Sequence, residues 1–204
     1  TVELTDVVVQ QKGMYTSPWN SMTISVNGGG TVIVQSGTYS TECLTAEEAN
    51  NQGTSHGPWV AGVLNSGGTL IINGGTFSND NFGENSLATY ARGAILADTG
   101  ANIQINGGTF NALKAIVDIQ NNLGDASKNP TGEIKGGIFS ADPSNAYVKV
   151  AEGYVVIENN GVWTVAKAVA KIGETTYTSL ADAFAAAQAG DTITLLADVT
   201  AWTR

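Results

Sequence analysis

Charged residues are scarce in this chain, which has nine Lys plus Arg and 18 Asp plus Glu among 204 residues. The formal net charge is −9, and nucleic-acid binding needs clustered positive charge that such a composition does not supply. The same deficit argues against attraction to an anionic lipid surface. We therefore expect neither nucleic acid nor a lipid surface as a partner.

Cysteine and long apolar runs are also nearly absent. Cys43 is the only cysteine, which excludes an internal disulfide framework and a thiolate metal cluster, and it is expected to be a small buried residue or an unpaired loop thiol. No stretch approaches the roughly 18 apolar residues of a membrane span, so no membrane insertion is expected. No signal peptide is recognisable, and both ends read like those of a fragment cut from a longer protein. No motif predicts a cofactor or a metal site.

Glycine, by contrast, is abundant at 25 residues, and much of it falls in a repeated phrase. Each copy of the phrase has a short strand, a glycine corner and an aromatic residue. The aromatic residues Tyr39, Phe77, Phe110 and Phe139 recur at intervals of 38, 33 and 29 residues, as expected for a repeat with loops of variable length. The four copies span residues 32–39, 70–77, 103–110 and, in degenerate form, 133–139.

Apolar residues alternate within each copy, as Leu70 and Ile72 do, so one face of each strand is expected to be buried. Repeated strands bury such a face by stacking about 4.8 Å apart, with like residues above like. The expected columns are Val34/Ile72/Ile105/Ile134 inside, Tyr39/Phe77/Phe110/Phe139 beside them, Thr38/Thr76/Thr109/Ile138, and Gln35/Asn73/Asn106/Lys135.

These columns predict an all-β fold, a right-handed parallel β-helix (solenoid), in which the right hand follows from the usual crossover between parallel strands. An antiparallel sandwich is the alternative, because it too has short strands and glycine turns. It does not explain why the same phrase repeats in the same order. A hairpin over residues 155–165, turning at Asn160-Gly161, is expected to cap the last turn of the solenoid.

The composition changes from Ala166 onward. A tight hairpin is predicted over 171–177, followed by a helix over 179–189 with Ser179 as its N-cap and Gly190 as its stop. Leu180, Ala183, Phe184 and Ala187 are expected to share its apolar face, and a strand closes the unit over 191–196. The chain therefore divides into residues 1–165, the parallel β-helix with its capping hairpin, and residues 166–204, a hairpin-helix-strand unit expected to start a following module.

Candidate ligand-binding residues are the loop aromatics Trp19, Trp59 and Tyr90, whose rings would stack on sugar rings. The longest insertion, 41–59, also holds His56 near Glu47 and Glu48, the most reactive local set. The oxygen-rich stretch 78–85 is more typical of a solvated turn than of a calcium loop.

The carboxylates Asp98 and Asp118 suggest a glycosidase pair, but aligning their strands places Asp118 beside Ala97. This is one position away from Asp98, and one position reverses the face of a strand. No catalytic residue is therefore predicted.

The Gly-Gly-Thr-Phe phrase and the closing stretches 136–144, 151–154 and 161–165 resemble those of large secreted repeat proteins of gut-dwelling Gram-positive bacteria. Those are surface or adhesin-like proteins with pectin-lyase-like β-helix domains. The resemblance covers roughly residues 28–165, and 172–200 resembles the hairpin, helix and first strand that open a further β-helix module. It implies an extracellular location, secreted or on the bacterial cell surface, and a parent with several modules. It carries over no catalytic residues.

Three functions are consistent with these patterns. The first is a non-enzymatic surface module, an adhesin or stalk segment that binds carbohydrate, with a host or dietary glycan, a host surface protein and further modules of the parent chain as expected partners. The alternative is a polysaccharide lyase or glycoside hydrolase, although fold alone is weak support for function. Ice binding by the threonine column is the third, but that column is one residue wide and interrupted at Ile138.

Overall fold

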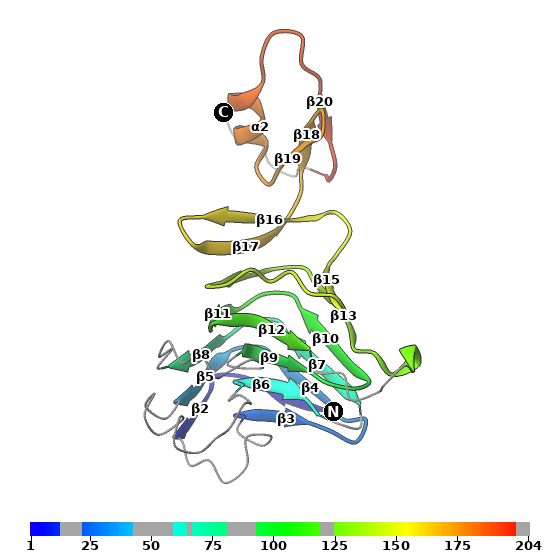
Figure 1. The fold of residues 1–204 in the computed structure, drawn as a ribbon. Helices are drawn as coiled ribbons and strands as arrows, with labels where there is room; N and C mark the ends of the chain where they lie inside the picture. Colours follow the sequence, from blue (N-terminus) through cyan, green and yellow to red (C-terminus); the bar gives the residue numbers. More distant parts are fainter. Residues whose placement is uncertain (13–21, 43–58, 65–66, 81–92, 119–124, 199–204) are drawn as a thin grey trace.

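Parallel β-sheets dominate the computed structural model, which describes residues 1–12, 22–42, 59–64, 67–80, 93–118 and 125–198. Up to β14, consecutive strands fall in turn into three sheets, which we call sheets 1, 2 and 3, so that each sheet receives every third strand (Figure 1). This confirms the prediction of an all-β chain built from parallel strands.

Strands three positions apart in the chain are therefore neighbours within a sheet. In spatial order, sheet 1 consists of β1 (Val2–Leu4), β4 (Thr31–Val34), β7 (Gly68–Ile72), β10 (Ala101–Ile105), β13 (Thr131–Ile134) and β15 (Val148–Val150). Sheet 2 consists of β16 (Tyr154–Asn159), β17 (Val162–Lys167), β14 (Gly137–Phe139), β11 (Thr109–Asn111), β8 (Thr76–Asp80), β5 (Gly37–Glu42) and β2 (Val7–Lys12). Sheet 3 consists of β12 (Lys114–Asp118), β9 (Gly93–Ala97), β6 (Ala61–Val63) and β3 (Ile24–Val26).

The inner column of sheet 1 has the register that the repeat predicts. Ile72 pairs with Val34 on one side and with Ile105 on the other, and Ile105 pairs with Ile134. All four side chains are fully buried. The core thus forms because identical strand patterns lie directly above one another, which is how short strands bury a face that none could bury alone.

Glycine is required at the corner between sheets 1 and 2 by close backbone approach. A Cβ on Gly74 would lie 2.6 Å from the carbonyl oxygen of Gln35, and one on Gly107 would lie 2.7 Å from that of Asn73. The second glycine of each pair has positive φ, 100° at Gly75 and 108° at Gly108, which side-chain-bearing residues rarely adopt.

Past the corner, the four aromatic rings form one continuous stack. Tyr39 and Phe77 lie 5.1 Å apart between centroids, Phe77 and Phe110 also 5.1 Å, and Phe110 and Phe139 4.7 Å. The interplanar angles are 16°, 9° and 9°, and no ring is more than 1% exposed. The rings are nearly parallel because equivalent residues on paired strands share one orientation.

A ladder of amide side chains follows the same corner on the outside. Gln35 Nε2 donates to Glu3 Oε1 at 2.6 Å, Asn73 Nδ2 to Gln35 Oε1 at 2.9 Å, and Asn106 Nδ2 to Asn73 Oδ1 at 2.8 Å. The first three members of the predicted column Gln35/Asn73/Asn106/Lys135 therefore form a hydrogen-bonded chain, whereas Lys135 pairs with Glu133. Gln35 and Asn73 each use both donor and acceptor along the stack, which adds to the register set by the backbone.

The hairpin predicted over 155–165 is present as β16 and β17, with β17 pairing antiparallel to β14. Its turn residues Asn160 and Gly161 have φ of 53° and 78°, as in the tight turns that Asn-Gly favours. The hairpin continues sheet 2 beyond β14, the last of its parallel strands (Figure 1). It thereby covers a sheet edge that would otherwise be open to another chain.

The C-terminal unit is a small antiparallel sheet with one helix. Its strands are β19 (Thr175–Tyr177), β18 (Ala170–Ile172) and β20 (Ile193–Leu195), in that order, and the helix is α2 (Leu180–Ala186). The unit lies beyond the β16–β17 hairpin, at the opposite end from β1 to β3 (Figure 1). A short 3-10 helix, η2 (Ala126–Lys128), precedes β13.

Helix α2 differs from its prediction in two respects. Ser179 caps it as expected, accepting a hydrogen bond from the Asp182 amide, but the helix ends before Ala187, whose ψ of 137° is extended. The chain then turns so that the Gln188 amide donates to Asp191 Oδ2 at 2.8 Å, which competes with further helical hydrogen bonds. Phe184, expected on the apolar face, is 51% exposed, and Ala183 is the buried residue of the helix. Within the described ranges, no helix is long and apolar enough to cross a membrane.

The aromatic stack predicts a large stability loss on truncation. Phe110→Ala should lower the free energy of unfolding by about 3–5 kcal/mol, because it removes a buried ring that has an aromatic neighbour on both sides. Phe184→Ala is the matched control, since this ring is half exposed, and should cost less than about 1 kcal/mol. Urea unfolding followed by circular dichroism measures both, and equal losses would contradict the role of the stack.

Close approach of the strands predicts a second sensitive position, Gly132. A Cβ there would collide with the carbonyl oxygen of Ile103 on β10, so Gly132→Ala should cost about 3 kcal/mol or more. Gly153 also has positive φ but has nothing within 4 Å of an added Cβ, so Gly153→Ala tests backbone strain alone. Thermal unfolding of the two variants separates the steric clash of the added Cβ from backbone strain. Similar melting temperatures would contradict the close approach of Gly132 to β10.

Candidate functional site

The structure places the predicted sugar-stacking aromatics unequally. Trp59 is fully buried and packs in a small core cluster with Met22, Leu64, Leu96 and Val117. Its ring therefore presents no face to a ligand in solution. Trp19 and Tyr90 lie outside the described residues, as do Cys43, Glu47, Glu48 and His56.

The register of sheet 3 confirms the spacing argument for Asp98 and Asp118. Asp118 pairs with Ala97, so the two aspartates are one position out of step. Asp98 is only 1% exposed, and its Oδ1 accepts hydrogen bonds from the Thr99 amide at 2.6 Å and the Thr99 hydroxyl at 3.1 Å. Asp98 thus closes a turn after β9. The side chain of Asp118 lies outside the described part of the chain.

Other carboxylates also bond to turns, Asp142 and Glu158 within their own turns and Asp6 to the turn before β5, 30 residues away. Asp6 accepts from the Ser36 hydroxyl at 2.6 Å, Asp142 from the Ser144 amide at 2.8 Å, and Glu158 from the Gly161 amide at 2.6 Å. Hydrogen bonds from Ser127 lower the pKa of Asp125, since they favour its charged form. Among the described residues, no three His, Cys, Asp or Glu side chains gather closely enough to hold a metal ion.

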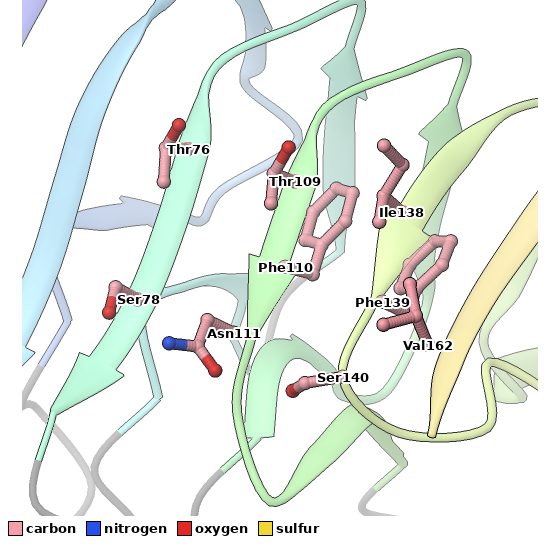
Figure 2. A pocket seen from close by; sticks show the side chains of 9 residues that line it. All are labelled: Thr76, Ser78, Thr109, Phe110, Asn111, Ile138, Phe139, Ser140 and Val162. Carbon is pink, nitrogen blue, oxygen red and sulfur yellow. The ribbon is translucent and has the colours of Figure 1, made fainter. Parts of the chain in front are cut away.

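An open groove of about 320 Å³ lies on the outer face of sheet 2, near the hairpin. Figure 2 shows Thr76 and Thr109 at equivalent positions on neighbouring strands, with Ile138 on the next. The groove is lined by Thr76, Ser78, Thr109, Phe110, Asn111, Ile138, Phe139, Ser140 and Val162. All nine residues are uncharged. Phe110 and Phe139 are buried, so the exposed groups are the hydroxyl and amide side chains and the apolar side chains of Ile138 and Val162.

Strand alternation positions these groups. The aromatic residue of each copy points inward, so the residues before and after it point outward. Two outward columns result: Thr38, Thr76 and Thr109 continue to Ile138, and Ser40, Ser78 and Asn111 run beside them. Sequence reasoning identified the first column but missed the second, whose signal is the Ser or Asn that follows each Tyr or Phe.

A second groove of about 290 Å³, on sheet 1, is charged. It is lined by Asn102, Gln104, Thr131, Gly132, Glu133 and Lys135. Lys135 Nζ lies 2.7 Å from Glu133 Oε2, and this carboxylate raises the pKa of the Lys135 ammonium. Because the two charges already pair, this groove offers less unsatisfied hydrogen-bonding capacity to a ligand than its composition suggests.

A structural role for Asp98 makes a specific prediction. Asp98→Ala should lower the free energy of unfolding by about 1–3 kcal/mol, because the buried turn loses its acceptor. Asp98→Asn keeps a carbonyl oxygen and should recover part of that loss. Chemical denaturation of both variants measures the difference, and equal stability of Asp98→Ala and the parent chain would contradict this role.

Comparison of the chain with protein-family models, curated proteins and solved structures finds no match. Its function must therefore be inferred from its own residues and geometry.

Proposed function

We propose that the chain is a non-enzymatic extracellular surface module, an adhesin or stalk segment that binds glycans, built on a right-handed parallel β-helix. The cyclic order of strands through sheets 1, 2 and 3 supports the β-helix. So do the columns of like residues, which a solenoid produces by stacking one turn on the next. Such a scaffold holds its outer surface rigidly, as a binding platform requires.

The use of the acidic side chains carries the non-enzymatic part of this proposal. Glycoside hydrolysis uses two carboxyl groups on either side of the scissile bond. Here Asp6, Asp98, Asp142 and Glu158 each bond to a nearby serine hydroxyl or turn backbone, and the sheet 3 register keeps Asp98 and Asp118 out of step. Asp98, Asp142 and Glu158 therefore cap their own turns, and Asp6 links its turn to the neighbouring one at Ser36.

The groove on sheet 2 supports binding of a glycan. Sugars present hydroxyl groups at their edges and C–H groups on their faces, so a complementary site combines polar side chains with apolar ones. The polar side chains of the groove include Thr76, Thr109 and Asn111, and its apolar side chains include Ile138 and Val162. Both apolar side chains are 46% exposed.

The C-terminal unit supports a parent with several modules. β20 (Ile193-Thr194-Leu195) has the same apolar-polar-apolar pattern as β1 (Val2-Glu3-Leu4), and each is an edge strand of its sheet. We therefore propose that residues 166–204 open a further module in which β20 takes the place of β1. The large secreted surface proteins of gut-dwelling Gram-positive bacteria, which the phrases resemble, would have this organisation.

The proposal predicts glycan retention without cleavage. The intact chain should be retained on at least one member of a panel of plant, mucin and microbial polysaccharides, and the unbound solution should contain no newly released oligosaccharide. Affinity electrophoresis measures retention, and chromatography of the supernatant measures release. An inert protein of similar acidity is the control.

Release of oligosaccharides would contradict the non-enzymatic function and favour a lyase or hydrolase. The absence of retention on the whole panel would contradict glycan binding and leave a structural stalk.

A further inference from the structure

We propose that the outer face of sheet 2 binds an uncharged, linear polysaccharide that crosses strands β5, β8, β11 and β14. This inference rests on the proposed glycan-binding function and specifies its site and ligand class. Four features of the face support it: repeated spacing, charge, unused hydrogen-bonding groups and an apolar end.

Repeated spacing favours a polymer. Thr109 pairs with Thr76, which pairs with Thr38, so the same hydroxyl recurs on three successive strands, about 4.8 Å apart. Ser78 pairs with Ser40 and with Asn111 in the same way. A linear polysaccharide also presents the same groups at a regular short interval. A chain laid across the strands would meet equivalent partners at each one.

Charge distinguishes the first two outward columns of sheet 2 from sheet 1, although the third position of the same alternation is ionisable on β2, β5 and β8, where Lys12, Glu42 and Asp80 occupy paired positions. The first outward column of sheet 2 runs through Val8, Thr38, Thr76, Thr109, Ile138 and Thr164, and none of these residues is ionisable. On sheet 1 the corresponding outer column contains Glu3, Glu133 and Lys149. An anionic polysaccharide would find no cation in the sheet 2 column and would approach a chain of net charge −9. An uncharged ligand needs no cation partner and is not repelled by the negative charge of the chain.

Unused hydrogen-bonding groups are present along the groove. Within the described residues, the side chains of Thr76, Thr109 and Asn111 make no hydrogen bond. The Ser140 hydroxyl, in contrast, donates to the Ala112 carbonyl and accepts from the Ala112 amide, both at 2.9 Å. Ser140 therefore fixes the end of the groove, whereas the other three groups remain for a ligand.

The apolar end makes the two ends of the face different, so a ligand would bind in one direction. Ile138 continues the threonine column onto β14, and Val162 lines the same groove from β17 (Figure 2). Strand β17 closes the run of parallel strands. C–H groups of a sugar ring would pack there while its hydroxyls bond to Thr109 and Asn111. The ligand would therefore lie along the columns with one end against the hairpin.

The test measures binding of the intact chain to two uncharged linear polysaccharides, unbranched β-mannan and mixed-linkage β-glucan, and to two anionic ones, polygalacturonate and alginate. Thr109→Glu places a charge at the centre of the face and should weaken binding of the retained uncharged polymer at least tenfold. Thr69→Glu makes the same change on β7 of sheet 1 and should leave binding unchanged. The double variant Thr76→Val, Thr109→Val keeps the side-chain shape but removes both hydroxyls, and it should also weaken binding. It provides the test if Thr109→Glu fails to fold.

Each result is decisive. Binding of an uncharged polymer that is lost in the sheet 2 variants and kept in Thr69→Glu supports the site and the ligand class. Equal binding by all folded variants would overturn the site but leave the glycan-binding function standing. Retention of only the anionic polymers would overturn the ligand class. Retention of none would overturn both this inference and glycan binding by these polymers.

Discussion

The in-register pairing of parallel strands is the constraint on which the rest of this molecule depends. Backbone hydrogen bonds fix Ile72 between Val34 and Ile105, and the same register places Phe77 between Tyr39 and Phe110. Once the backbones are aligned, every side-chain column follows from strand alternation. The buried aromatic stack, the amide ladder and the outer hydroxyl columns are therefore consequences of one pattern, and a slip of one residue would disrupt all three.

Close packing of strands also explains the surface. Glycine corners let neighbouring backbones approach, as at Gly74 and Gly107, and the aromatic residue that follows fills the interior. The residues on either side of that aromatic have no room inside and must face outward. The repeat thus fixes which positions face outward but not their chemistry: the outer column of sheet 1 changes from Ile71 to Glu133, whereas on sheet 2 Thr76 and Thr109 are alike. Small hydroxyl groups there leave the outer face open to a ligand.

The sequence predicted the features that follow from the repeat or from a local turn or cap signal. It missed the features that depend on contacts between unrelated segments of the chain. Alternation and the Gly-Gly corner were sufficient for the inner columns and the amide column, because each depends on equivalent positions of the repeat. The closing hairpin was predicted instead from its Asn160-Gly161 turn. The burial of Trp59 depends on Met22, Leu64, Leu96 and Val117, which come from unrelated positions of the chain. The early end of α2 depends on the Gln188–Asp191 turn, and Phe184 is exposed because Ala183 is the residue that the helix buries. The groove depends on Val162, which the antiparallel hairpin brings to β14, and no repeat spacing relates these segments.

Binding at sheet 2 is tested directly by NMR titration of the intact chain with a short oligosaccharide cut from whichever uncharged polysaccharide it retains. Chemical-shift changes should concentrate on sheet 2, at Thr76, Ser78, Thr109, Asn111, Ile138 and Val162, with little change at Glu133 and Lys135 of sheet 1. Saturable shifts confined to sheet 1 or to other parts of the chain would contradict binding at sheet 2.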